Sequence, residues 1–68
     1  METEEHQRKG RAIVVYLYED KRTGGWSWEY TLDNPLNRYK MEERRPCHSR
    51  EQAVSEALND AEWRHELR

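Results

Sequence analysis

The chain has 68 residues, of which 34% are hydrophobic and 38% are charged, and 12 basic and 14 acidic side chains give it a formal net charge of −2. This balance excludes a strongly basic protein that coats nucleic acid, and it excludes a purely acidic one. No segment approaches the roughly 18 apolar residues of a membrane helix, and no signal peptide is visible. The single cysteine, Cys47, cannot form a disulfide within the chain, so we expect a cytoplasmic protein with no membrane contact.

A chain of this length makes at most one domain. Domains near this size bury only about 60% of the surface that the unfolded chain exposes, which leaves them marginally stable. The three tryptophans and four tyrosines partly compensate, because each large ring buries on the order of 150–250 Å². Self-association is a further source of stability for so small a core.

Residues 1–10 are almost wholly polar and show no apolar periodicity. A segment with nothing to bury predicts a disordered leader. Its charges change from acidic to basic along the chain, so it is not a single-sign arm for nucleic acid. We therefore expect the domain to occupy residues 11–68.

The first strand is expected at residues 11–19, which are rich in β-branched and aromatic residues. Both of its faces are apolar, with Ile13, Val15 and Leu17 on one and Val14, Tyr16 and Tyr18 on the other. Such a strand is usually central in its sheet or has its second face covered. Charged residues and two glycines follow at residues 20–25, which indicates a hairpin loop.

Residues 25–32 predict the second strand, around which the chain is organised. Large residues alternate strictly with polar ones, which is the period of a half-buried strand. The large residues on one face are Trp26, Trp28, Tyr30 and Leu32. The polar residues on the other are Ser27, Glu29 and Thr31. We expect the indole rings to form the core.

A weaker third strand is expected at residues 38–44, after a turn at residues 33–37. Tyr39 and Met41 alternate there with charged residues, which is typical of an edge strand. Pro46 ends the strand.

The last element is predicted to be a helix from Ser49 to about Glu66. Ser49 and Gln52 have the spacing of a capping box, in which the serine oxygen accepts from the backbone N–H of Gln52. An alanine-rich stripe at helical spacing can approach the sheet closely, and it consists of Ala53, Val54, Ala57, Leu58 and Ala61.

Trp63 lies roughly 150–160° from the centre of this stripe, at 100° per residue. Leu67 is one turn further along, so the two side chains can pair. Three interpretations remain open: the helix ends early and Trp63 folds back onto the sheet, Trp63 meets a partner or a second copy, or Trp63 is merely exposed.

Few residues suggest chemistry. The only Cys–His neighbours, Cys47 and His48, are too few for a metal site, which needs three or four ligands. The carboxylates of Glu42 and Glu43 would point to opposite sides of a strand. Because no set of acid, base and nucleophile is visible, we expect no enzyme, no catalytic residue, no metal and no cofactor.

Aromatic rings among basic side chains suggest a second function, the stacking of single-stranded nucleic acid. The rings concerned are Tyr16, Tyr18, Trp26, Trp28, Tyr30 and Tyr39. The basic residues are Arg22, Arg38, Lys40 and Arg44. We favour a core role for Trp26, Trp28 and Tyr30, since the alanine stripe needs an apolar surface to cover.

The order of strand, glycine-bearing turn, Trp-rich strand, strand and a helix beginning Ser49-Arg50-Glu51-Gln52-Ala53-Val54 resembles the βββα modules of HicB-like antitoxin domains and YegP-like domains. The resemblance covers about residues 11–66. It implies an α+β fold, a three-stranded antiparallel meander with one C-terminal helix packed on one face. The chain lacks the glycine- and proline-rich second strand of HicB-like domains and their appended DNA-binding segment, and it has one copy where YegP-like domains are repeated. The resemblance therefore implies a fold and no functional residue.

We hypothesise a small non-catalytic protein-interaction module whose partner is another protein or a second copy of itself. The candidate partner surface consists of Tyr16, Tyr18, Trp63 and Leu67. Nucleic-acid binding is the alternative, disfavoured by the acidic residues that interleave with the tyrosines.

Overall fold

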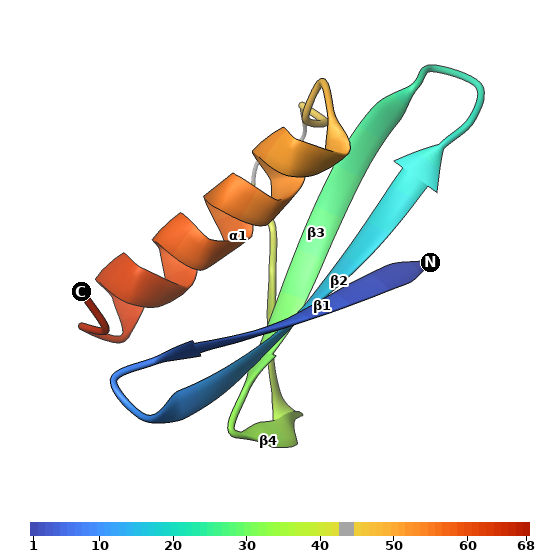
Figure 1. The fold of residues 1–68 in the computed structure, drawn as a ribbon. Helices are drawn as coiled ribbons and strands as arrows, with labels where there is room; N and C mark the ends of the chain where they lie inside the picture. Colours follow the sequence, from blue (N-terminus) through green and yellow to red (C-terminus); the bar gives the residue numbers. More distant parts are fainter. Residues whose placement is uncertain (43–44) are drawn as a thin grey trace.

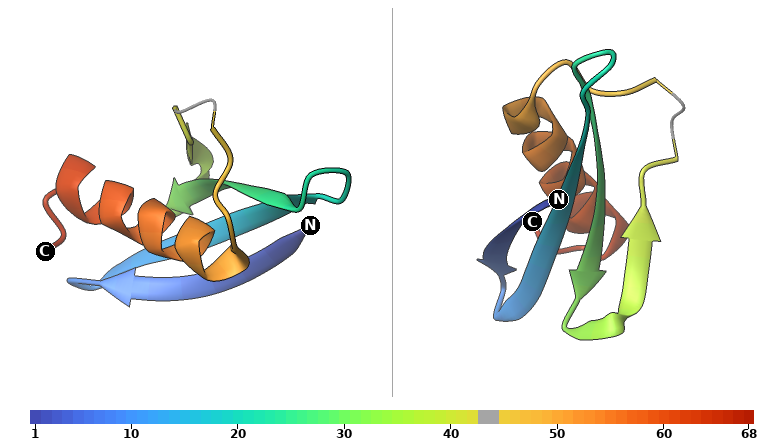
Figure 2. Two further views of the ribbon diagram at one scale, coloured as in Figure 1. Left: turned by 90° about the horizontal axis from the view of Figure 1, so that it is seen from above. Right: turned by 90° about the vertical axis from the view of Figure 1, so that its right-hand side faces the viewer.

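The computed structural model describes residues 1–42 and 45–68 (Figure 1). Within them the elements are β1 (Glu2–Arg8), β2 (Arg11–Asp20), β3 (Gly25–Leu32), β4 (Asn34–Lys40) and α1 (Arg50–Arg64). The strands form one antiparallel sheet in the order β1-β2-β3-β4. The helix lies across one face of this sheet, as the views in Figure 2 show. The α+β class and the C-terminal helix are confirmed, but the sheet has four strands in the described residues rather than the predicted three.

The additional strand is β1, in the segment expected to be disordered. Each of its residues pairs with β2, from Glu2 opposite Leu17 to Arg8 opposite Arg11. Its attachment to the helix is ionic, since Arg50 donates to Glu2 at 2.6 Å and also pairs with Glu4. A search for apolar periodicity misses such a strand, because ion pairs and backbone hydrogen bonds hold it in place.

The two central strands supply the apolar side of the sheet. Ile13 stands opposite Leu32, Val15 opposite Tyr30 and Leu17 opposite Trp28. Residues directly opposite one another in an antiparallel pair share a face, so these side chains all meet α1. The buried core consists of Ile13, Val15, Leu17, Trp28, Tyr30, Leu32, Cys47, Ala53, Ala57, Ala61 and Leu67. The prediction that the middle strand lies beneath the helix is confirmed for Trp28, Tyr30 and Leu32, whereas Trp26 is only partly buried at the margin of this core.

The fourth strand begins earlier than expected. The segment predicted as a turn, residues 33–37, lies mostly within β4, and of the predicted strand 38–44 the last two residues lie outside the described part of the chain. The turn is confined to Asp33, whose backbone is left-handed at φ 61°, beside a register shift between Thr31 and Leu32. Asp33 also accepts the backbone N–H of Ala12 at 3.0 Å, which ties this turn to β2.

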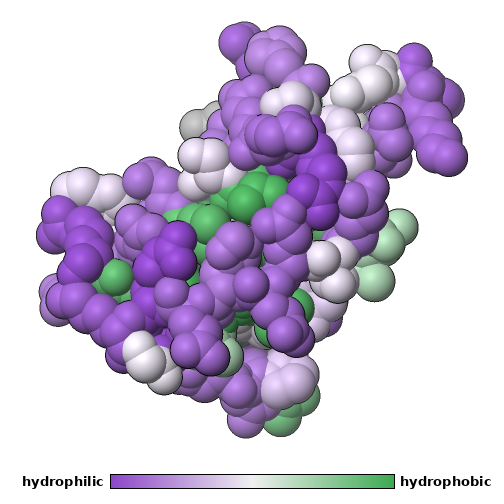
Figure 3. Space-filling view, viewed as in Figure 1, coloured by the Kyte–Doolittle hydropathy of each residue, from purple (hydrophilic) through white to green (hydrophobic). Residues whose placement is uncertain are grey.

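The ends of α1 explain the fate of its last residues. Ser49 caps the first turn by accepting from the backbone N–H of Gln52 at 3.1 Å, as the sequence predicts, while Gln52 accepts from the backbone of His48. At the other end Glu66 is left-handed at φ 56°, and Leu67 donates to the carbonyl of Glu62 at 2.8 Å. This reversal turns the chain back, because a left-handed residue after the helix redirects it. Apolar colour in Figure 3 gathers in a strip beside α1, with hydrophilic surface around it.

Candidate functional site

The face of the sheet opposite α1 is the candidate site. Its side chains are the ones that alternate with the core residues along each strand. We call this the open face, and across the sheet it carries Thr3, Glu5, Gln7, Ala12, Val14, Tyr16, Tyr18, Ser27, Glu29, Thr31, Arg38 and Lys40. In the described part of the chain no second helix or sheet covers it.

Glu29 is at the centre of the open face. Although it lies on the side without a helix, only 7% of its surface is exposed. The hydroxyl of Tyr18 donates to Glu29 Oε1, and Nη1 of Arg38 donates to the same oxygen at 3.2 Å. The guanidinium of Arg38 also lies over the ring of Tyr16, 4.8 Å from its centroid. Three strands are therefore joined around one carboxylate.

The second oxygen of that carboxylate has a different environment. Glu29 Oε2 is buried, and the described residues offer it no hydrogen-bond donor. A buried oxygen that carries charge and lacks a donor costs free energy, because water is lost and nothing replaces it. The hydrogen bond that Tyr18 donates to Glu29 raises the pKa of the Tyr18 phenol, with burial as a further cause, so this donor stays protonated at neutral pH.

A shallow hollow opens beside Glu29. Its volume is about 260 Å³, and it is lined by Tyr18, Ser27, Trp28, Glu29, Lys40 and Met41. Small-molecule sites usually enclose about 300–1,000 Å³. The hollow therefore suits a single side chain of a partner better than a cofactor.

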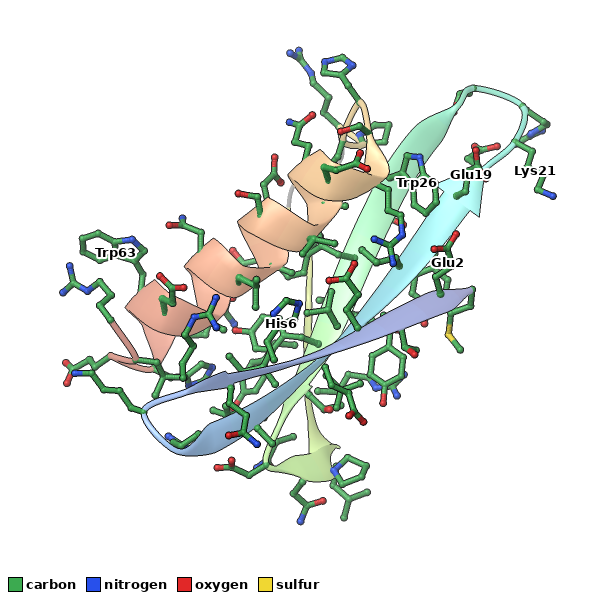
Figure 4. All side chains as sticks on the ribbon, viewed as in Figure 1. Glu2, His6, Glu19, Lys21, Trp26 and Trp63 are labelled. Atoms are coloured by element: carbon green, nitrogen blue, oxygen red, sulfur yellow. The ribbon has the colours of Figure 1, made fainter. Side chains whose placement is uncertain are left out.

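The candidate partner residues do not form one surface. Tyr16 and Tyr18 lie half-buried on the open face. Trp63 is 58% exposed on the outer side of α1, where the guanidinium of Arg68 lies 3.5 Å from its ring centroid (Figure 4). Leu67 was expected to be exposed beside Trp63, and this is wrong: the left-handed Glu66 turns it into the core, where it is 5% exposed.

Sequence reasoning missed the importance of Glu29 and Arg38 for this face. The alternation placed Glu29 on the face assigned to Tyr16 and Tyr18, but it did not show that Tyr16 is its direct neighbour across the strands. That neighbour follows once the hairpin register is known, since Tyr16 stands directly opposite Glu29. The sequence feature that could have predicted this pairing is the length of the loop after Asp20, because the loop length fixes the register of β2 and β3.

A second polar cluster lies under the end of α1. The hydroxyl of Tyr30 donates to Asp60 at 2.5 Å and lies 3.3 Å from Nε2 of His65, whose ring meets Tyr39 edge-on at 4.6 Å. Burial raises the pKa of Tyr30 and lowers that of His65. Tyr30 is fully buried, so this cluster fastens the helix to the sheet rather than facing a ligand.

The remaining sequence features are separated in space. Cys47 is buried while His48 is exposed. The pair Glu42–Glu43 and the cation Arg44 fall partly or wholly outside the described residues. Among residues 1–42 and 45–68 no three side chains of metal-ligand type come together, and no helix has the length and apolar content needed to cross a membrane.

Comparison of the chain with protein-family models, with curated proteins and with solved structures found no match. The resemblance to HicB-like and YegP-like modules therefore stays a prediction.

Proposed function

We propose that this protein is a small non-catalytic interaction module that binds a protein partner through the open face. The observation that carries the proposal is Glu29 Oε2, a buried carboxylate oxygen to which the described residues donate no hydrogen bond. A partner cation that meets the Glu29 carboxylate, once this side chain turns toward the hollow, would supply the missing N–H group and remove an energetic cost present in the unbound protein.

The surroundings of Glu29 define the kind of group that fits. An arginine or lysine side chain from the partner can enter the 260 Å³ hollow with its apolar stem against Met41 and its charge at Glu29. Tyr16 and Tyr18 supply flat aromatic surface beside it, and tyrosine is enriched at interfaces because its ring is apolar and its hydroxyl bonds. We place this binding in the cytoplasm, where the buried thiol of Cys47 stays reduced.

Single-stranded nucleic acid fits the same face less well. Of the six aromatic residues considered for stacking, only Tyr16 and Tyr18 lie on the open face. The other four lie on the face that α1 covers: Trp26, Trp28, Tyr30 and Tyr39. Glu5 and Glu29 bring negative charge to the open face, which repels phosphate.

The proposal is tested by selecting peptides from a displayed random library on the immobilised protein. We expect enriched peptides to contain a common arginine or lysine, and we expect their affinity to fall at least tenfold for Glu29→Gln. Glu5→Gln is the matched control, since Glu5 is exposed on the same face and its loss should leave the affinity within twofold.

Peptides that bind wild type and Glu29→Gln equally would overturn the assignment of Glu29. The competitor is an oligothymidine titrated at low salt, followed through the amide NMR signals of Tyr16, Tyr18 and Ser27. If the selection enriches no basic peptide and the oligothymidine gives saturable shifts, the proposed protein partner is wrong and the open face binds nucleic acid.

A further inference from the structure

The outer edge of β1 is the feature that the proposed function leaves unused. β1 is the first strand of the sheet, and in the described part of the chain no strand pairs with its outer side. An edge of this kind presents a row of backbone N–H and C=O groups to any strand that can join it. The question is which strand fits.

The hydrogen bonds of Ala12 show which groups of β1 point outward. Ala12 donates its N–H to Asp33 at 3.0 Å, and its carbonyl accepts from the N–H of Asp33 at 2.8 Å, so both backbone groups face β3. Because backbone direction alternates along a strand, Ile13 turns toward β1 and so does its partner His6. The outward groups of β1 are then those of Thr3, Glu5 and Gln7.

The charges of β1 are separated along its length. The first half carries Glu2, Glu4 and Glu5, and the second half carries His6 and Arg8. An antiparallel copy of the same strand brings the basic end of one chain against the acidic end of the other. Opposite charges directly across a strand pair stabilise the pairing.

We propose that two copies of this chain pair β1 to β1, antiparallel, about a two-fold axis at Glu5. In this register Thr3 of each chain stands opposite Gln7 of the other, and both present outward backbone groups. Glu2 stands opposite Arg8 of the second copy, and Glu4 opposite His6 of the second copy. Glu2 and Arg8 keep their contacts with α1, namely with Arg50 and Glu62, and each gains a second oppositely charged neighbour.

The other edge of the sheet is a poorer candidate. β4 contains Pro35, which has no N–H to donate, and Asn34 uses its side chain to accept from the backbone of Leu36 at 2.9 Å. Its charged residues, Arg38 and Lys40, are both basic, so two copies of β4 repel each other. Self-complementarity is a property of β1.

The two-fold axis at Glu5 weakens the dimer, and its affinity therefore depends on the side chain at this position. Two Glu5 carboxylates meet there on the open face, and like charges directly opposite are destabilising. The two-fold axis stands perpendicular to the sheet, so both open faces lie on the same side. A dimer would then present two Glu29 sites to a bivalent partner.

Sedimentation equilibrium across a wide concentration range tests the pairing. We expect wild type to dimerise weakly at high concentration and low salt, and Glu5→Thr to dimerise at least fivefold more tightly because the repulsion is removed. Glu5→Pro should be monomeric, since it deletes an outward N–H and leaves the β1–β2 hydrogen bonds intact. Circular dichroism confirms that both variants fold.

Register is read directly from a mixed sample of labelled and unlabelled chains. The Hα atoms of Glu4 and of His6 in the second copy face each other in a non-hydrogen-bonded pair, so an intermolecular NOE is expected between them. A strict monomer for wild type and Glu5→Thr alike would overturn the proposal, and so would a dimer that survives Glu5→Pro. Glu29→Gln should leave dimerisation unchanged, which separates this result from the test of the open face.

Discussion

The two faces of the sheet both carry aromatic residues, but the rings are held by different forces. On the helix side Trp28 and Tyr30 stack at 5.9 Å and are buried against a helix whose facing residues are alanines. On the open side Tyr16 and Tyr18 are fixed by a guanidinium and a carboxylate, those of Arg38 and Glu29. The first face is held mainly by buried packing, to which the hydrogen bond from Tyr30 to Asp60 is added, and the second is held by charge. Only the second therefore keeps polar groups that a partner can engage.

The largest difference between the faces is expected from removal of an indole ring. Trp28→Ala should lower the free energy of unfolding by about 3–5 kcal/mol, since Trp28 is 6% exposed and its loss opens a cavity. That is a large share of the 5–15 kcal/mol typical of a domain. Urea denaturation followed by circular dichroism measures it. Trp63→Ala is the matched control and should change stability by less than about 0.5 kcal/mol; equal losses for the two would contradict the assignment of the core.

Overpacking the helix side should have the next largest effect. Ala57 is fully buried where α1 meets the sheet, so Ala57→Leu should cost about 1–3 kcal/mol by forcing the helix away. Ser55→Leu, at an exposed position of the same helix, should be nearly neutral. The same urea titration compares them, and a neutral Ala57→Leu would show that the helix does not lie close to the sheet.

How far the sequence predicts each region depends on whether apolar packing or charge holds that region in place. The alternation of Trp26, Trp28 and Tyr30 placed β3 beneath the helix, because an apolar core leaves a periodic pattern. β1 leaves no such pattern: its attachment comes from Arg50, whose partners Glu2 and Glu4 are distant in sequence. Leu67 was misplaced because its burial depends on one left-handed residue, Glu66, and helical spacing does not predict where the helix stops.

The candidate site was predictable in part. Tyr16 and Tyr18 were assigned to the face away from the core, and the structure places them there. Glu29 and Arg38 were visible as polar residues, but their convergence depends on the registers of two strand pairs. The β3–β4 register contains a shift between Thr31 and Leu32 that no local rule in the sequence indicates.

On the open face, the counterpart of Trp28→Ala is a change that removes a hydroxyl group and keeps the ring. Tyr18→Phe should cost about 1–2 kcal/mol, because Glu29 loses a charge-assisted hydrogen bond while Arg38 remains. Tyr16→Phe is the control, since Tyr16 contacts Arg38 through its ring, which phenylalanine preserves. A loss for Tyr16→Phe as large as that for Tyr18→Phe would show that the hydroxyl of Tyr18 is not what holds Glu29.

The smallest expected effect is the pH dependence that His65 contributes on the helix side. Burial, with repulsion from Arg64 and Arg11 as smaller causes, lowers the pKa of His65 below its usual 6.5. Between the folded-state pKa of His65 and pH 6.5, the unfolded chain binds more protons than the folded one. The free energy of unfolding therefore rises with pH in this interval. The contribution of His65 is therefore complete above about pH 6.5 and is lost as the pH falls toward the folded-state pKa. Urea midpoints at pH 7.5 and 5.5 should differ more for wild type than for His65→Gln, and an NMR titration of the His65 ring should give a pKa below 6.5. A His65 pKa equal to or above 6.5 would mean that the polar cluster beneath α1 is open to water, and that the helix side is less dry than its alanine packing implies.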